Sequence, residues 1–554
     1  MKTSKVFYEY VCVFFLVGLW YYNQYINWNG EFLDTDNFFH AIRMVDWVEN
    51  PSFWERKIMV SNYPFGEVSH WTRFIYLFWY MLSLPFMSFY SVKVAVVLGG
   101  LFLCPLFLLL SVVFLFKFMR YFLGVKCRFI CFVMMWVCAG ISRTAIFFRP
   151  DHHIIFLFLS ILLLYLNAVF FKTNNDNVFK YIGITLAVAL WVAVEGVFLW
   201  ASCLIFLHVL YLLYDLKYEY IKKVSLYYAI FGTLFWLINP CYQGWFYIDT
   251  GRISLFYVIF NWGVYFSLYI CQNIKNKVNL TIALLGCQLF IFVVMYLLGW
   301  IKSPIDERIV PLFIDRISEM KGINIQTGAY PFVGIILGVL LWRIHKDNQI
   351  YLYVFISLLL FTGLTIYNIR FLQYSGLYAI IMMGFFLQNR IDNNKKSAMI
   401  IFFLVCLEYI GFIVNLMVFS SIFEKPSPVL KLDGFDKIPD GCVVTDVFFG
   451  PYIVWGANKP VVASPYHQNV EGIIDNHNIL FSTDEREVIN LMKKHKVGSV
   501  YLVDTLDNYY AEPKNNCDKL YGMILGCKNY PEWLIPVDEK DYLFKVDYTK
   551  FPKF

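Results

Sequence analysis

Long apolar runs are the feature that most constrains this chain of 554 residues. A transmembrane helix needs about 20 consecutive apolar residues, and runs of this length recur along most of the sequence. Charged residues make up 16% of the chain, against about 25% in soluble domains. The sequence therefore predicts a polytopic α-helical membrane protein. Its net charge of +6 is explained by basic loops on one side of a membrane, and no nucleic acid partner is expected.

The apolar runs predict about 13 transmembrane spans. They cover residues 7–27, 91–116, 129–147, 153–171, 180–196, 198–214, 224–240, 254–271, 279–300, 329–343, 350–366, 371–388 and 397–420. Residues 74–90 are also apolar, but they contain Pro85 and follow a polar loop. We expect them to form an interfacial or re-entrant segment.

The distribution of Lys and Arg predicts the orientation of these spans. The loop 117–128 carries four basic residues and no acid, whereas the loop 28–73 has more acids than bases. This bias places the N-terminus in the cytoplasm and the tail after Ser421 outside. The prediction is an integral protein of a bacterial inner membrane with a periplasmic C-terminal domain.

The polar tail differs in composition from the rest of the chain. Short β-rich runs at 442–445 and 499–503 alternate with a helical pattern at 485–495, which favours an α/β fold. We predict a transmembrane domain over 1–420 and an extracytoplasmic domain over 421–554. If the tail is exported, a disulfide between Cys517 and Cys527 is plausible, although both could also stay reduced.

Two acids, Asp34 and Asp36, follow the first predicted span. Acids at the edge of a span are costly and are usually functional, and hard divalent cations prefer oxygen ligands. In an extended segment these two side chains would point the same way. The simpler interpretation is a solvated loop that happens to contain two acids.

A second cluster, Asp151-His152-His153, lies at the start of the fourth span on the same predicted side. Carboxylate with imidazole suits Mn²⁺, and carboxylates alone suit Mg²⁺ equally well. Asp is also a favoured helix N-cap, so a capped helix with two interfacial histidines is the structural alternative.

Two further features lie later in the chain on the predicted outer side. Arg316-Ile317-Ser318-Glu319 belongs to the charged loop 301–328, where a solvated loop is the default interpretation. Arg370 breaks the local charge bias between two spans. It could snorkel to the interface, or its planar guanidinium could bind a phosphate.

In this order, the four features resemble the catalytic subunits of membrane oligosaccharyltransferases, in the archaeal and bacterial single-subunit form of the GT-C glycosyltransferase superfamily. The resemblance implies a GT-C fold with about 13 transmembrane helices. It also implies a divalent cation, Mn²⁺ or Mg²⁺, a polyprenyl-linked sugar donor and a protein or glycolipid acceptor. The implied metal ligands are Asp36, Asp151 and His153, and Arg370 is the implied ligand of the donor pyrophosphate.

The expected reaction is glycosyl transfer at the outer membrane surface. Asp34 or Asp36 could act as general base, Glu319 could orient the acceptor, and His70 could contact the substrate. His40, Glu195 and Asp249 are secondary candidates that could equally be structural.

The chain departs from the family at one motif. The Trp-Trp-Asp-Tyr-Gly acceptor motif is absent, and Gly450–Gly456 stands in a comparable place without the Asp. Asn, Ser or Thr acceptors and a growing lipid-linked glycan therefore stay open. The alternatives are a GT-C transferase that modifies lipopolysaccharide or another glycolipid, a lipid-linked sugar transporter and a membrane scaffold. A transporter would need ionisable residues near the membrane midplane, where the sequence has few.

Overall fold

The structure is a computed structural model that describes residues 2–26, 28, 30–52, 54, 56–317, 320–322, 329–393, 435–503, 516–540 and 542–553. It forms two compact units. The first contains Met1–Phe32, Trp71–Lys302 and Glu319–Asn415, and the second contains Leu33–His70, Ser303–Ser318 and Leu416–Phe554.

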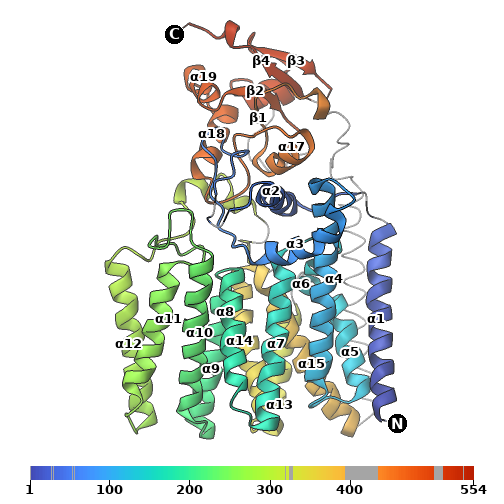
Figure 1. Cartoon of the computed structure of the whole chain (residues 1–554), viewed down its shortest axis with the longest axis vertical. Coiled ribbons are helices and arrows are strands. Elements are labelled where there is room, and N and C mark those ends of the chain that lie inside the picture. Colours follow the sequence, from blue (N-terminus) through green and yellow to red (C-terminus); the bar gives the residue numbers. More distant parts are fainter. Residues whose placement is uncertain are drawn as a thin grey trace. The chain divides into compact units, whose positions relative to one another are not determined.

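The first unit is a bundle of long helices that run alongside one another (Figure 1). Its helices are α1 (Lys2–Ile26), α3 (Phe74–Met87), α4 (Val92–Met119), α5 (Val125–Val137), α6 (Ala139–Thr144), α7 (His152–Thr173), α8 (Val178–Val192), α9 (Gly196–Tyr214), α10 (Tyr218–Ile238), α11 (Leu255–Cys271), α12 (Lys277–Leu297), α13 (Ala329–His345), α14 (Gln349–Tyr367) and α15 (Leu372–Asn393). Among the described helices, seven are long and apolar enough to cross a membrane. Several shorter apolar helices, such as α8 and α11, accompany them.

These helices confirm a polytopic helical fold, and each predicted span up to residue 388 coincides with helix. The span predicted at 129–147 differs, because it is divided at Cys138 into α5 and α6. The span predicted at 397–420 lies outside the described residues, so the total of about 13 spans stays a prediction.

The apolar segment at 74–90 contains helix α3, with Pro85 inside its last turn. Helix α3 packs closely on α4. A Cβ added at Gly99 would lie 2.1 Å from the Ser83 hydroxyl, and one at Gly100 would lie 2.7 Å from the Trp79 ring. Two adjacent glycines therefore allow the contact that buries Trp79 completely.

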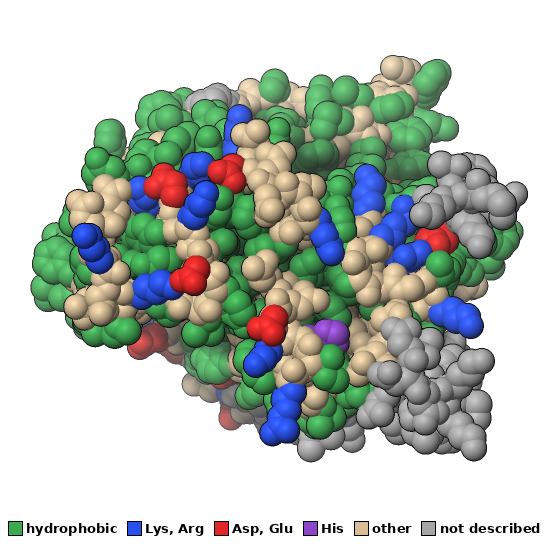
Figure 2. Space-filling model, turned by 90° about the horizontal axis from the view of Figure 1, so that it is seen from below, with side chains coloured by type: hydrophobic (Ala, Val, Ile, Leu, Met, Phe, Trp, Pro, Cys, Tyr) green, Lys and Arg blue, Asp and Glu red, His purple; other side chains and the backbone are tan. Residues whose placement is uncertain are grey.

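The end of the bundle that carries the N-terminus is the one predicted to face the cytoplasm. Figure 2 views the molecule from this end and shows Lys and Arg side chains spread among hydrophobic ones. Here Glu9 of α1 pairs with Arg128 at 2.7 Å and with Arg120 at 3.4 Å. The pairing fastens α1 to the first turn of α5 and to the C-terminal end of α4.

The second unit is built on a four-stranded sheet in the order β1-β2-β4-β3. Its strands are β1 (Cys442–Val444), β2 (Val497–Tyr501), β3 (Leu534–Asp538) and β4 (Leu543–Val546). Strands β1 and β2 are parallel and the other pairs are antiparallel. Helices α17 (Gly450–Ala457), α18 (Val470–Phe481), α19 (Glu485–Lys494) and α20 (Leu520–Gly522) complete it. The α/β fold predicted for the tail is confirmed.

Segments from two loops of the membrane region belong to this same unit. The segment 33–70 contains α2 (Thr35–Glu49), and its backbone meets the tail where the Val461 N–H donates to the Val60 carbonyl at 2.9 Å. In the segment 303–318, Ile309 and Phe313 pack in one apolar cluster with Ile473 of α18. The compact unit is thus larger than the predicted domain 421–554. The predicted boundary at 420 itself lies outside the described residues and stays a prediction.

Cys517 and Cys527 form a disulfide in this unit, with their Cα atoms 5.8 Å apart. The pairing that the sequence left open is therefore present in the structure.

Candidate functional site

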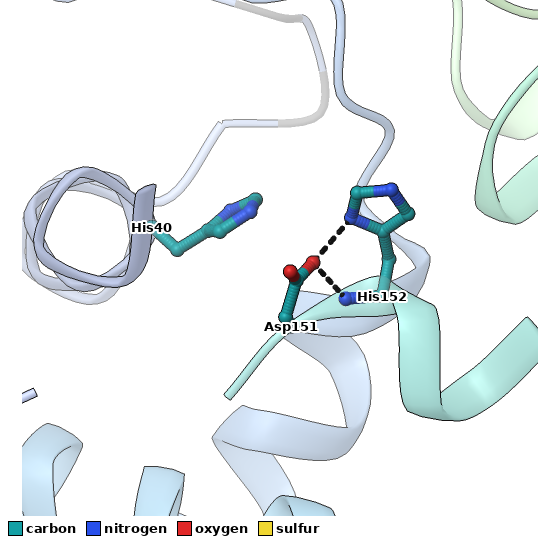
Figure 3. A group of neighbouring side chains, drawn as sticks. All are labelled: His40, Asp151 and His152. Carbon is teal, nitrogen blue, oxygen red and sulfur yellow. Dashed lines mark hydrogen bonds and ion pairs between the residues drawn. The ribbon is translucent and has the colours of Figure 1, made fainter. Parts of the chain in front are cut away.

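Asp151 caps helix α7 and lies at the centre of a buried polar cluster in the bundle. Its carboxylate accepts the His152 backbone N–H at 2.5 Å, and the same oxygen lies 2.6 Å from Nδ1 of the His152 ring (Figure 3). Its other oxygen lies 3.6 Å from Arg149 and 3.8 Å from Nε2 of His153. The two interpretations of Asp151 from the sequence, a helix cap and a member of a cluster of candidate ligands, therefore both apply.

The surroundings of Asp151 favour its charged form. Burial alone would raise the pKa of this carboxyl, but His153, His152 and Arg149 outweigh burial and hold the pKa well below its ordinary value. Only 3% of Asp151 is exposed, so the anion is stabilised by these neighbours rather than by solvent.

Arg370 and Glu195 come to the same cluster from other helices. Arg370 lies in a single turn, η4 (Ile369–Phe371), between α14 and α15, and its guanidinium forms an ion pair with Glu195. Glu195 lies at the break between α8 and α9. The next residue must be small, because a Cβ at Gly196 would lie 2.3 Å from the Ala189 carbonyl carbon. The arginine that broke the predicted charge bias thus has an acidic partner.

The side chains of His152, His153 and Glu195 could bind one metal ion. Each offers one ligand atom, and these three atoms lie within 4.8 Å of one another. Two imidazoles and a carboxylate, with Asp151 bonded to the first imidazole, are a donor set that suits a divalent transition metal. This donor set fits a divalent cation, and it shares His153 with the predicted ligands Asp36, Asp151 and His153, whose roles stay predictions. Glu195 was only a secondary candidate in the sequence analysis, because its position in the chain, far from Asp151 and Arg370, gives no sign that it belongs to this cluster.

Asp34 and Asp36 lie in the second unit and differ in conformation from the extended pair that the sequence predicted. Asp34 is the N-cap of α2, and its side chain accepts the Asn37 N–H at 3.1 Å. Asp36 lies inside the first turn of that helix. The geometric prediction was wrong, because an Asp before a helix start is used as a cap rather than as half of an extended pair. Their predicted roles in catalysis stay predictions.

Tyr466, which the sequence did not single out, contacts the second of these acids. Its hydroxyl donates to Oδ1 of Asp36 at 3.2 Å, and its ring lies 4.1 Å from the ring of Phe39. Burial, followed by the Asp36 carboxylate, raises the pKa of Tyr466 well above its ordinary value. The two residues are 430 positions apart, so no local pattern could have joined them.

Histidines adjoin this contact in the same unit. The ring of His70 lies 4.3 Å from that of His467 and 6.5 Å from that of Tyr466. His40, on α2, is fully buried. The predicted substrate contact at His70 therefore lies beside the Asp36 group within this unit.

The predicted Ser318 and Glu319 lie outside the described residues. The residues that follow them pack in the bundle against the turn of Arg370. The Ile369 N–H donates to the Lys321 carbonyl at 2.9 Å, and the Asn368 amide lies 3.3 Å from the Met320 sulfur. The segment directly after the Ile317-Ser318-Glu319 motif is thus fixed beside Arg370.

The chain combines a helical bundle that carries a polar cluster at helix ends with a small α/β unit, and this fold is similar to that of solved oligosaccharyltransferases. Solved structures with a similar fold include those of the oligosaccharyltransferase of Archaeoglobus fulgidus. Its apo form matches with a TM-score of 0.64 and 15% identity, over 90% of this chain and 70% of that one.

Two complexes of the same archaeal enzyme match similarly. The complex of AglB with an inhibitory peptide and a dolichol-phosphate gives a TM-score of 0.63 and 12% identity, over 93% of this chain and 71% of that one. The complex with Zn and sulfate gives a TM-score of 0.60 and 13% identity, over 86% of this chain and 65% of that one.

This chain thus spans about two thirds of the length of these neighbours, and the likeness establishes the fold. The predicted fold class is confirmed. No family model and no curated protein matches the sequence.

Proposed function

We propose that this protein is a metal-dependent glycosyltransferase that moves a glycan from a polyprenyl-(pyro)phosphate donor to a protein acceptor at the outer face of a membrane. The observation that carries the proposal is the cluster of Asp151, His152, His153, Glu195 and Arg370, assembled from three helix ends of a bundle with the oligosaccharyltransferase fold. An anion-binding arginine beside a candidate cation site suits a lipid-linked phosphate.

The residues would divide the work as follows. Asp36, Asp151 and His153 would hold the cation, Mn²⁺ or Mg²⁺, and Glu195 would be a further ligand, because one ligand atom of its carboxylate lies within 4.8 Å of a ligand atom of His153. When bound, the ion supplies positive charge to the departing phosphate. Arg370 would hold the same phosphate with charge-assisted hydrogen bonds, and Glu319 would orient the acceptor from its loop.

Glu195 would set the state of Arg370 before the donor arrives. Its ion pair holds the guanidinium beside His152 and His153. An arriving phosphate would compete with the Glu195 carboxylate for the same N–H groups, while the cation would offer that carboxylate a new partner. Donor and cation would then favour one another's binding.

Solved neighbours support the donor and acceptor classes. AglB has been captured with a dolichol-phosphate and an inhibitory peptide, and the archaeal enzyme with a tethered peptide containing the NVT sequon. This chain lacks the Trp-Trp-Asp-Tyr-Gly motif, and α17 stands at the comparable place. We therefore propose a protein acceptor without assigning its side chain.

We also propose that the N-terminus is cytoplasmic and that the second unit is periplasmic, in a bacterial inner membrane. Disulfides persist in oxidising compartments, and the Cys517–Cys527 bond supports an exported location. The basic loops near the N-terminal end of the bundle support the same orientation.

The test is transfer of glycan from a lipid-linked donor in membranes that contain the full chain. Asp36→Ala should abolish Mn²⁺-stimulated transfer, whereas Asp46→Ala, a change to another acid of the same helix, should leave it intact. Retained transfer in Asp36→Ala at normal expression would sink the assignment. Mass spectrometry of a deletion strain distinguishes acceptors: loss of glycoproteins supports the proposal, and loss of a modified glycolipid with intact glycoproteins supports the alternative.

A further inference from the structure

We propose that Tyr466 is a positioning residue that orients the Asp36 carboxylate for the catalytic cation, through the hydrogen bond that its hydroxyl donates to Oδ1 of Asp36. The inference rests on the proposed function and adds to it a residue from the C-terminal part of the chain. Neither the four motifs of the sequence nor the fold comparison assigns a role to Tyr466.

The ring of Tyr466 is held in place before it contacts Asp36. Only 3% of the residue is exposed, and the ring lies against Phe39, one turn after Asp36 on the same helix. Its backbone is fixed on both sides, because its N–H donates to Ser464 and its carbonyl accepts from Asn469, each at 2.8 Å. The hydroxyl therefore has little freedom to leave Oδ1.

A buried polar network fastens the segment around Tyr466 to the segment around Asp36. The Ser61 hydroxyl donates to Glu67 at 2.7 Å and lies 2.8 Å from the Ser464 hydroxyl. Ser464 also donates to Glu67, and the Asn469 amide donates to Ser61 at 3.3 Å. This network joins the first loop to the residues on both sides of Tyr466, and it therefore holds the segment of Tyr466 beside the segment of Asp36.

Hydrogen bonds of this kind matter because a carboxylate can rotate and can bind a cation in several ways. A donor fixed on one oxygen selects one orientation, which lowers the entropy lost when the ion binds. Removing such an outer partner typically costs about 10- to 100-fold in metal affinity or activity. Asp36 lies in the first turn of α2, where the backbone alone leaves several side-chain rotamers available.

The decisive variant is Tyr466→Phe in the full chain, because it removes the hydroxyl and keeps the ring against Phe39. Its matched control is Tyr548→Phe in the same unit, whose hydroxyl donates only to backbone carbonyls, those of Met492 and Val497, among its described partners. Binding of Mn²⁺ to the purified protein is followed by the electron paramagnetic resonance signal of the free ion. Transfer is measured in parallel as a function of Mn²⁺ concentration.

We expect Tyr466→Phe to weaken Mn²⁺ binding about tenfold, to raise by a similar factor the Mn²⁺ concentration for half-maximal transfer, and to restore most of kcat at saturating Mn²⁺. Tyr548→Phe should match the wild type in all three. Unchanged Mn²⁺ binding in Tyr466→Phe would overturn the inference, even if transfer falls, because the hydroxyl would then act elsewhere.

The proposed function fails separately from this inference. If the wild type shows no Mn²⁺-stimulated transfer, or if Asp36→Asn binds Mn²⁺ as the wild type does, the metal assignment itself is wrong and the inference falls with it. If both behave as proposed and only Tyr466→Phe is silent, the inference alone is overturned.

Discussion

Asp151 in the bundle and Asp36 in the second unit are both acids at the start of a helix, yet they are held in different ways. The described ion-pair partners of the Asp151 carboxylate are Arg149, His152 and His153, which all lie within two positions of it in the chain. The phenol that contacts Asp36 comes from a residue 430 positions away. The first acid is set by local sequence and the second by the folding of the C-terminal part onto the first loop.

Because the two acids are held differently, we expect substitutions at them to affect stability and activity differently. Asp151 is almost fully buried, so its charge is compensated inside the bundle or not at all. Asp36 is partly exposed, and solvent can share in its stabilisation. Changes at Asp151 should therefore affect stability as well as transfer, whereas changes at Asp36 itself should affect transfer more than stability.

The largest effect is expected for Asp151→Asn. Asn can still cap α7, so the change isolates the charge. Removing one member of a buried ion pair costs about 3–5 kcal/mol, since the Arg149 guanidinium would stay buried without the compensating charge of Asp151. We expect a large drop in the thermal unfolding midpoint of the detergent-solubilised protein, together with loss of transfer.

The control for Asp151→Asn is Asp306→Asn, which breaks the exposed pair of Asp306 with Arg308. Exposed ion pairs contribute little, and no measurable change in the midpoint is expected. If the two variants unfold alike, the contrast between a buried and an exposed acid does not hold for this protein.

The second prediction concerns Glu67, a buried acid in the first loop that accepts hydrogen bonds from Ser61 of the same loop and from Ser464 near Tyr466. Burial, opposed by hydrogen bonds from Ser464 and Ser61, raises the pKa of Glu67 from 4.5 to about 7. The folded state then holds a proton that the unfolded state releases between these two values. The contribution of Glu67 to the free energy of unfolding is therefore full below pH 4.5. It falls between pH 4.5 and about pH 7, by about 1.4 kcal/mol per pH unit at most, and it levels off above pH 7.

Glu67→Gln should remove this slope, since the amide mimics the protonated acid. Unfolding is measured from pH 5 to pH 8. The variant should be about as stable as the wild type at pH 5 and more stable at pH 8, by up to about 3 kcal/mol in the free energy of unfolding. Glu487→Gln is the matched control, because Glu487 likewise accepts two side-chain hydrogen bonds, from Asn478 and Ser482, but is partly exposed. A slope that survives in Glu67→Gln would assign the pH dependence to other groups.

The third prediction tests the second unit away from Asp36. Replacing Cys517 and Cys527 by Ser opens a short loop that the disulfide closes over a separation of 10 residues. The loss should be roughly 2–3 kcal/mol of unfolding free energy. Because the bond is distant in sequence from the Asp36 group, Mn²⁺-stimulated transfer below the unfolding temperature should be unchanged. Adding reductant to the wild type should reproduce the shift, and a shift in the double Ser variant upon reduction would contradict this explanation.

The comparison also explains what the sequence could predict. Apolar runs report membrane spans directly, because a lipid-facing helix must be apolar over its whole length. The cluster at Asp151 could be predicted because its residues are neighbours in the sequence. Three adjacent residues at a span boundary stay adjacent when the helix forms.

The rest of the site depends on contacts that no window of sequence contains. Glu195 became a partner of Arg370 only when the start of α9 was placed beside η4. Gly196 permits the close approach of this start to the end of α8. Tyr466 lies in a segment with no periodic pattern, and its role follows from a contact with α2. The extended geometry assumed for Asp34 and Asp36 was wrong because the spacing of two acids does not reveal where a helix begins.

The smallest expected effect sharpens that last point at Asp34. Its side chain caps α2, so Asp34→Ala should cost about 1 kcal/mol of unfolding free energy, as Asp484→Ala should for the equivalent cap of α19. Asp34→Asn keeps the cap and loses the charge. We expect it to unfold and transfer like the wild type, because a cap needs an acceptor oxygen and not an anion. If Asp34→Asn is stable but inactive, Asp34 takes part in the chemistry, and the contrast drawn between the two acids of this pair would be replaced by a shared role.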